Sequence, residues 1–483
     1  MPWFERLSSL DFAFLNLEDR NKHMHVGGLA LFEGPPPEYE ALLRLVESRL
    51  PRVPRYRQRL AWVPFQQGRP VWVDEAQFDL EHHVRHTALP APGSEAQLLE
   101  LTGRLMAQPL DRSKPLWEMW LIGGVGEDHR GFAIVTKTHH CMVDGISGMD
   151  IASVLMDPEP VHEPPPLTSS WAPRPAPGGI ELLRASVKQQ LTELLKAARD
   201  LALRPGSDAR SLVAMLAGSV KPLLGLAQMG KAPGNSLNAP IGPRRRFCTA
   251  QLSLAEIKRV RAALGGTVND VLLAVVAGAL RRLLLARGET VGPDLRVLVP
   301  VSVRGRTARG SQTLGNQVIP TFCALPVGDP DPGRRLERVR ESMKGLKEGG
   351  QVMGAVALTR LSDFAPPTLL IQSARLQAVA TRYFNLVVTN VPGPQFPLYL
   401  LGRRLLACFP AVPLAALQTV CIGMLSYDGQ VGVGLLGDAE AARDLPMLAE
   451  NMIEALRELV ASAERAPATP LPSGDARAVA RNA

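Results

Sequence analysis

The chain has 483 residues, of which 46% are hydrophobic and 21% charged, and its formal net charge at pH 7 is +8. These values are typical of a globular protein with two or three structural units, each large enough to bury a core. The positive excess favours anionic partners. However, aromatic residues make up only 5% and no RNA-recognition, zinc-finger or helix-turn-helix pattern occurs, so we expect no nucleic-acid partner.

The cysteines and the N-terminal residues indicate the cellular compartment in which the protein works. The five cysteines are widely spaced and form no C-x-x-C pair, which argues against a disulfide framework or a zinc site and for a reducing environment. The start, MPWFERLSSLDF, lacks the apolar core of a signal peptide, and no run of about 18 uncharged apolar residues occurs. We therefore expect a cytoplasmic protein without a transmembrane helix.

The first unit, residues 1–160, reads as mixed α/β. Apolar runs predict strands at 29–32 and 131–135, and the spacing over 41–50 predicts a helix. Composition then shifts at 157–179, which is rich in proline and reads as a linker or extended crossover.

The second unit, residues 161–245, contains this linker and amphipathic helices. Apolar residues at helical spacing fill 180–203, and a second apolar stretch covers 211–229. Residues 180–250 hold eleven Lys and Arg against four Asp and Glu. Two interpretations stay open: a helix packed on its own domain, or a basic apolar surface that rests on a membrane or lipid droplet.

The α/β pattern resumes in a third unit, residues 246–465. Helices are expected at 268–287 and 439–463, and strands at 296–303 and 385–389. Residues 466–483, rich in Pro, Ala, Ser and Arg, read as a disordered tail. The sequence thus predicts two α/β halves around a long connection.

The segment 138–145, THHCMVDG, carries the strongest chemical signal. The apolar run before it predicts a strand that ends at His139 and His140. Histidine suits a general base because its pKa lies near neutrality. Neighbouring side chains on a strand point to opposite faces, so only one of the two should face a cleft. Asp144 can orient the loop and Gly145 permits a tight turn; the alternative is a pair of packed core histidines.

This segment resembles the HHxxxDG signature of the superfamily of chloramphenicol acetyltransferase, condensation domains and plant acyl-CoA acyltransferases. Other segments, in the expected order, are similar to the wax ester synthase/diacylglycerol acyltransferase family. They are LSSLDFAFLNLEDRNKHMHVGGLALFE at 7–33, PLW at 115–117, GTVNDVLLAVVAGALRR at 266–282, PVSVRGR at 300–306, GNQV at 315–318 and NLVVTNVPGPQFPLYLLG at 385–402. The connection at 160–235 matches least.

The resemblance implies a layered α/β fold of two chloramphenicol-acetyltransferase-like subdomains, with an active-site tunnel between them. It implies that His140 takes the proton of an alcohol, whose oxygen attacks the thioester carbonyl of acyl-CoA without an acyl-enzyme. The acceptor would be a long-chain alcohol or diacylglycerol. Acyl-CoA is a substrate, and no metal or cofactor is implied. Asp144 is usually structural in such proteins.

Two other functions stay open. The first is a condensation-type acyltransferase that uses a carrier-protein thioester, although the chain contains no carrier domain. The second is a non-catalytic lipid-binding or droplet protein, against which the intact HHxxxDG motif argues.

Asn269 and Asp270 match an ND motif that the resemblance places at the active site. The same letters predict a capping box in which Thr267 caps a helix and Asp270, three residues on, reaches back to it. The two interpretations are compatible.

Three further candidates lie in the C-terminal half. The resemblance suggests an ion pair between Arg304 and Asp144, against a solvated arginine. It also places Thr389 and Asn390 where relatives hold a hydroxyl that stabilises the oxyanion; ordinary turn chemistry before Val-Pro-Gly-Pro is the alternative.

Other nucleophiles and ligands are weaker. No G-x-S-x-G elbow occurs. Cys141 adjoins His140 but diverges from it along a strand, so it is a poor nucleophile. His82, His83 and His86 have no matching carboxylate or cysteine pattern for a metal.

Overall fold

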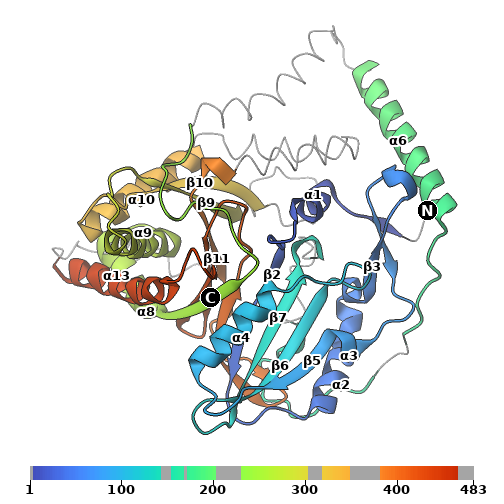
Figure 1. Cartoon of the computed structure of the whole chain (residues 1–483), viewed down its shortest axis with the longest axis horizontal. Coiled ribbons are helices and arrows are strands. Elements are labelled where there is room, and N and C mark those ends of the chain that lie inside the picture. The colour runs from blue at the N-terminus through green and yellow to red at the C-terminus, as the bar shows by residue number, and fades with distance from the viewer. Residues whose placement is uncertain are drawn as a thin grey trace, which may run out of the picture.

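The computed structural model describes residues 4–142, 154–167, 171–202, 230–302, 318–348 and 381–465. These residues form two halves side by side, each built on a six-stranded sheet with helices packed against it (Figure 1). The predicted mixed α/β architecture is therefore confirmed.

The sheet of the N-terminal half has the strand order β12-β13-β2-β7-β6-β5. Its strands are β2 (His25–Phe32), β5 (Val84–Ala88), β6 (Trp117–Val125), β7 (Gly131–His139), β12 (Tyr399–Leu400) and β13 (Arg403–Ala411). Strand β7 lies between β2 and β6, antiparallel to both. It is buried along nearly its whole length, which explains the continuous apolar run that predicted it.

Short elements surround this sheet. A small second sheet has the order β1-β4-β3. Its strands are β1 (Glu5–Arg6), β3 (Gln58–Ala61) and β4 (Val71–Asp74). The helices of this half and its extension are α1 (Ser9–Leu17), α2 (Tyr39–Arg49), α3 (Leu80–His83), α4 (Glu95–Ala107) and α6 (Gly179–Ala202), with 3-10 turns η1 (Leu50–Arg52), η2 (Pro54–Arg57), η3 (Pro64–Gln66) and η4 (His140–Met142).

The sheet of the C-terminal half has the order β10-β9-β11-β14-β15-β8. Its strands are β8 (Arg245–Ser253), β9 (Leu295–Ser302), β10 (Val318–Leu325), β11 (Leu386–Pro392), β14 (Val420–Tyr427) and β15 (Gln430–Asp438). The helices are α8 (Leu254–Leu264), α9 (Val268–Ala286), α10 (Pro332–Glu348) and α13 (Leu445–Arg465), with the turn η5 (Thr381–Tyr383).

Helix α9 is the centre of this half's core. It packs between α10 and α13, and its apolar residues are almost all buried. No single helix in the described part of the chain is long and apolar enough to cross a membrane; α8 and α9 pass that test only as a pair bent by 101°.

One segment departs from the expected division at residue 246. Strands β12 and β13 belong by sequence to the C-terminal unit, yet β13 pairs with β2 in the N-terminal sheet. It also crosses the C-terminal sheet closely, because a Cβ added at Gly432 or Gly434 of β15 would collide with the carbonyl oxygens of Cys408 and Pro410. The glycines of β15 therefore allow one segment to join both halves. The exact boundaries of the units stay predictions.

Two element ends also differ from the sequence expectation. Strand β11 continues to Pro392 because its residues pair in parallel with β14. Among the described residues only β14 pairs with Pro392, so the missing N–H costs little. Helix α13 begins at Leu445 rather than 439, because Asp438 accepts the N–H groups of Glu440 and Ala441 and forms a separate turn before it.

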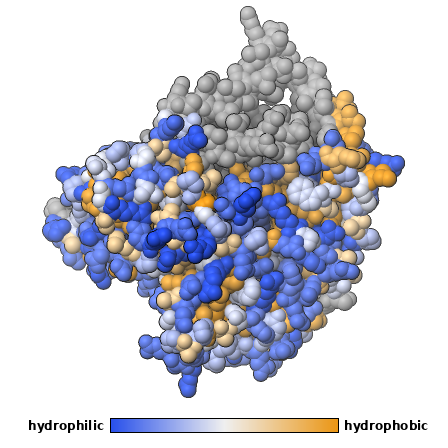
Figure 2. Space-filling model, viewed as in Figure 1, coloured by the Kyte–Doolittle hydropathy of each residue, from blue (hydrophilic) through white to orange (hydrophobic). Residues whose placement is uncertain are grey.

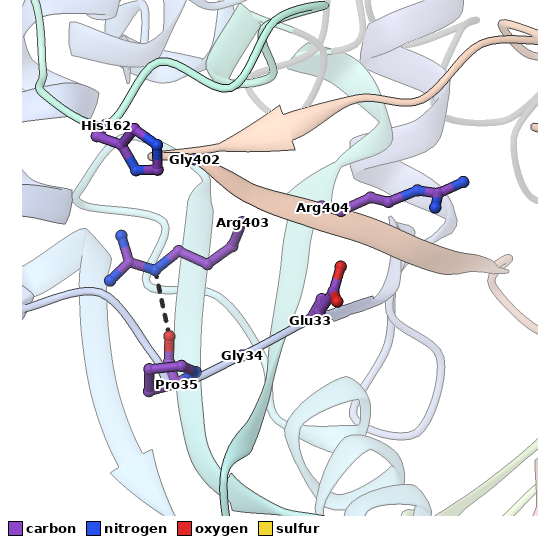
Figure 3. Close-up of a pocket in the computed structure, with 7 residues that line it drawn as sticks. All are labelled: Glu33, Gly34, Pro35, His162, Gly402, Arg403 and Arg404. Atoms are coloured by element: carbon purple, nitrogen blue, oxygen red, sulfur yellow. Dashed lines mark hydrogen bonds between the residues drawn. The ribbon is translucent and has the colours of Figure 1, made fainter.

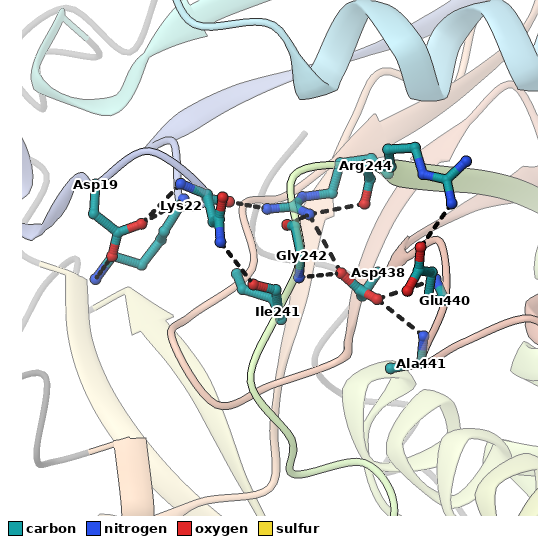
Figure 4. A network of polar contacts seen from close by, with 10 residues as sticks. Asp19, Lys22, Ile241, Gly242, Arg244, Asp438, Glu440 and Ala441 are labelled. Carbon is teal, nitrogen blue, oxygen red and sulfur yellow. Dashed lines mark hydrogen bonds and ion pairs between the residues drawn. The ribbon is translucent and has the colours of Figure 1, made fainter.

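A network of polar contacts around Gly242 and Asp438 joins the two halves (Figure 4). Arg245 of β8 donates to the backbone oxygen of Asn21 in the N-terminal half and to that of Gly242 at 2.8 Å. Its guanidinium lies 3.7 Å from the carboxylate of Asp438, which also accepts the Gly242 N–H at 2.6 Å. The side chains of Arg245 and Asp438 are both 4% exposed. The loop that follows α1 is thereby fixed to the C-terminal half.

Candidate active site

The two histidines of the motif lie where β7 ends, as predicted. His139 is the last residue of β7 and is buried, whereas His140 begins the turn η4 and is half-buried. The backbone N–H of His140 donates to the Met24 carbonyl at 2.8 Å, which pins the start of the turn against the segment before β2. The two side chains therefore occupy different surroundings.

The ring of His140 lies in an apolar setting. Phe14 of α1 packs against it, with ring centroids 4.0 Å apart and planes tilted by 33°. Burial lowers the pKa of His140 to about 4, and a hydrogen bond to its own backbone carbonyl opposes this only in part. Its Nδ1 is buried and has no hydrogen bond to another described residue. The imidazole is therefore neutral at pH 7 and able to accept a proton.

Glu18, at the end of α1, is a site residue that sequence reasoning missed. Its Oε1 lies 3.2 Å from Nε2 of His139 and 3.7 Å from Nε2 of His25, and its Oε2 lies 2.5 Å from Nη2 of Arg112. Burial would raise the pKa of this carboxyl, but the contacts with His139, Arg112 and the Met24 N–H together hold it well below its usual range. Its only signal was its place in the family-like segment 7–33.

Cys141 is not set up as a nucleophile. Its side chain is buried, and burial raises the pKa of the thiol well above its ordinary value. The thiol therefore stays protonated, in agreement with the expectation from sequence.

The structure brings together two of the predicted residues of the C-terminal half. Nδ2 of Asn390 on β11 donates to Oδ1 of Asn269, in the first turn of α9, at 3.3 Å. Thr389, the preceding residue of β11, is half-buried. The capping box is confirmed, because Asp270 accepts the N–H of Thr267 at 2.8 Å and Thr267 accepts that of Asp270 at 3.2 Å. The direct roles of Asn269, Asp270, Thr389 and Asn390 stay predictions.

Three predicted residues lie outside the described part of the chain. They are Asp144, Gly145 and Arg304. The proposed ion pair between Asp144 and Arg304 therefore stays a prediction.

A surface cavity of about 310 Å³ lies away from the motif (Figure 3). Its lining includes Gly34, His162, Arg403 and Arg404, beyond the Phe32 end of β2. The opposite end of β2 pairs with His139, so roughly 23 Å of strand separates the two places. Arg403 donates to the Leu401 carbonyl at 2.6 Å, and Arg404 pairs with Asp428 at 2.9 Å. These charges are already satisfied, and we assign no site there.

Comparison with known proteins supports the same class of enzyme. Residues 7–272 match the model of the wax ester synthase/diacylglycerol acyltransferase catalytic domain, and residues 314–460 match that of the family's C-terminal domain. A Mycobacterium tuberculosis protein named a "probable" diacylglycerol O-acyltransferase is 35% identical over 96% of this chain and 97% of its own length. A second one from that organism is 33% identical over 93% and 97%.

Solved structures give the same fold. The wax ester synthase/diacylglycerol acyltransferase of Marinobacter aquaeolei is 29% identical, with a TM-score of 0.65 over 95% of this chain and 100% of that one. The first condensation domain of the CDA synthetase has a TM-score of 0.56 at 17% identity, covering 96% and 97%, and so shares the fold. Fold and relatives define an acyl-CoA-dependent O-acyltransferase. The chain belongs to the wax ester synthase/diacylglycerol acyltransferase family.

Proposed function

We propose that the protein transfers a fatty acyl group from acyl-CoA to a long-chain alcohol or to diacylglycerol, with His140 as the general base. Nε2 of His140 takes the hydroxyl proton as the oxygen attacks the thioester carbonyl. A C–O bond forms, the C–S bond breaks, and the proton passes from His140 to the departing CoA sulfur. The substrates would meet in a tunnel between the two halves. No acyl-enzyme is needed.

The observation that supports this proposal most directly is the protonation state of His140. Burial keeps its imidazole neutral at pH 7, and the buried Nδ1 leaves Nε2 as the nitrogen that we assign to the substrate. The backbone around it is fixed by hydrogen bonds, and the neighbouring thiol of Cys141 is held protonated. Among the described residues the nucleophile beside this base, Cys141, is not activated, which fits direct transfer better than a covalent intermediate.

The acceptor is tested by mixing the protein with palmitoyl-CoA and a panel of hexadecanol, shorter alcohols and diacylglycerol. We expect stoichiometric release of free CoA and formation of the matching ester with at least one long-chain acceptor. No CoA release with any alcohol or diacylglycerol would contradict the proposal. Release only with a carrier-protein thioester as donor would favour the condensation-type reaction.

We further propose that the protein works in the cytoplasm at a lipid surface, which it contacts through α6. Ile180, Val187, Leu191 and Leu195 recur at helical spacing on one face, and they are 70%, 45%, 57% and 70% exposed. The other face packs on the N-terminal half through Leu182, which is buried against β4. The apolar face of α6 thus points outward (Figure 2).

The cations on α6 and the exposed side chain next to it favour an anionic lipid surface as the partner of this apolar face. Phe65 in η3, the turn that α6 packs against, is 84% exposed. Arg184 and Lys188 are exposed beside the apolar face. An apolar face flanked by cations is the arrangement of helices that lie in a membrane interface. Such a place would also supply water-insoluble acceptors.

Binding to lipid vesicles separates the contribution of the apolar face of α6 from that of its cations. Leu191→Gln with Leu195→Gln should weaken binding to anionic vesicles by roughly tenfold or more at every salt concentration. Arg184→Glu with Lys188→Glu should weaken it mainly at low salt, because each cation near an anionic leaflet contributes about 1 kcal/mol that salt screens.

Leu285, which is 47% exposed on α9, offers the control, and Leu285→Gln should bind normally. Normal binding by both double variants would contradict the lipid surface. A raised KM for acyl-CoA in the charge variant alone would assign these cations to CoA phosphates instead.

A further inference from the structure

We propose that Glu18 is a positioning residue that holds the backbone on both sides of His140 and so aims its ring at the substrates. The inference rests on the proposed role of His140 as the base. It concerns two paths of polar contacts that leave one carboxylate and meet at the peptide groups around His140.

The first path runs through Met24. Oε1 of Glu18 accepts the Met24 N–H at 2.8 Å, and the carbonyl of the same residue accepts the His140 N–H at 2.8 Å. Both sides of one residue are therefore engaged, one by Glu18 and one by His140. Movement of the carboxylate would free the segment around Met24, whose carbonyl holds the backbone of His140.

The second path runs through His139. Its Nδ1 accepts the N–H of Cys141 at 3.0 Å, so this nitrogen carries no proton. In the neutral ring the proton then sits on Nε2, which faces Oε1 of Glu18 at 3.2 Å. The negative charge of Glu18 beside Nε2 favours this tautomer of His139, the one that can hold the residue after His140.

Helix α1 makes the arrangement rigid. Phe14, which packs on the His140 ring, and Glu18 lie four residues apart, one turn along the chain. Arg112 holds the second oxygen of Glu18 and also donates to the Leu15 carbonyl at 3.0 Å. The carboxylate is 10% exposed and is kept ionised by these partners. The helix thus presents a packing group and a fixed acceptor to the same turn.

The test compares Glu18→Ala with Glu18→Gln. Loss of a group that orients a site residue typically costs 10–100-fold, so Glu18→Ala should lower kcat by about that factor while KM for acyl-CoA changes less than about twofold. Glu18→Gln keeps an oxygen for the Met24 and His139 donors and should restore most of kcat. A thermal unfolding curve for each variant establishes that it is folded at the assay temperature.

Asp19→Asn is the matched control. Asp19 is the next carboxylate in the chain and is 57% exposed, and it caps the N–H groups of Asn21 and Lys22 without touching His139 or Met24. It should keep normal kcat. A folded Glu18→Ala protein with normal kcat, or a Glu18→Gln protein as slow as Glu18→Ala, would overturn the positioning role. If His140→Ala also kept normal kcat, the base assignment itself would fail, so the two failures are distinguishable.

Discussion

Replacing His140 with alanine is expected to lower kcat by at least about 10²–10⁴-fold while the protein stays folded, because a positioned general base contributes about that much to rate. The side chain is half-buried at the end of β7, and it makes no side-chain hydrogen bond to another residue among those described, so its removal should disturb the fold little. Steady-state kinetics with acyl-CoA and an alcohol, together with thermal unfolding, measure both quantities.

The pH profile provides an independent check on the base. His140 accepts a proton only while neutral, so kcat/KM should be level near neutrality and fall as the pH drops toward its pKa of about 4. His139→Ala should lower the melting temperature because the Cys141 N–H loses its acceptor, and any loss of kcat should follow from the displaced turn rather than from loss of the base. Near-normal turnover in His140→Ala would contradict the assignment, whereas an acid limb at the ordinary histidine value would contradict the lowered pKa of His140.

Replacing Arg245 with alanine is expected to lower the free energy of unfolding by roughly 3–5 kcal/mol, the usual cost of removing one partner of a buried ion pair. The change leaves Asp438 without its cation and the Asn21 and Gly242 carbonyls without their donor. Burial, which also lowers the pKa of Arg245, makes these losses costly. Denaturant unfolding measures the change.

The neighbouring Arg244 provides the control. It pairs with Glu440 at 2.7 Å, but the two side chains are 72% and 65% exposed. Exposed pairs contribute about 0–1 kcal/mol, so Arg244→Ala should be nearly neutral. Equal losses in the two variants would show that the joint between the halves does not depend on Arg245.

Local patterns in the sequence were sufficient to predict several of the described elements, among them the strand that carries the histidine motif. The apolar run of β7, ending at the histidine pair, and the capping box of Thr267 and Asp270 at the start of α9 depend on residues a few positions apart. Such short-range signals survive in a single sequence because propensity, periodicity and capping act within one element. The family-like segments added the class of enzyme.

The sequence by itself determined that a histidine pair follows a buried strand in a two-halved acyltransferase. Only the tertiary structure decided which distant residues contact that pair and what joins the halves. Glu18 meets His139 across more than a hundred residues, Arg245 meets Asn21 across more than two hundred, and β13 pairs with β2 in the other half. The exposure of the apolar face of α6 was also decided by the tertiary structure. Periodicity in the sequence identifies an apolar stripe, but it does not show whether other residues cover that stripe. Burial and pairing between distant segments depend on the packed chain, and they set the charge state of His140 and Glu18.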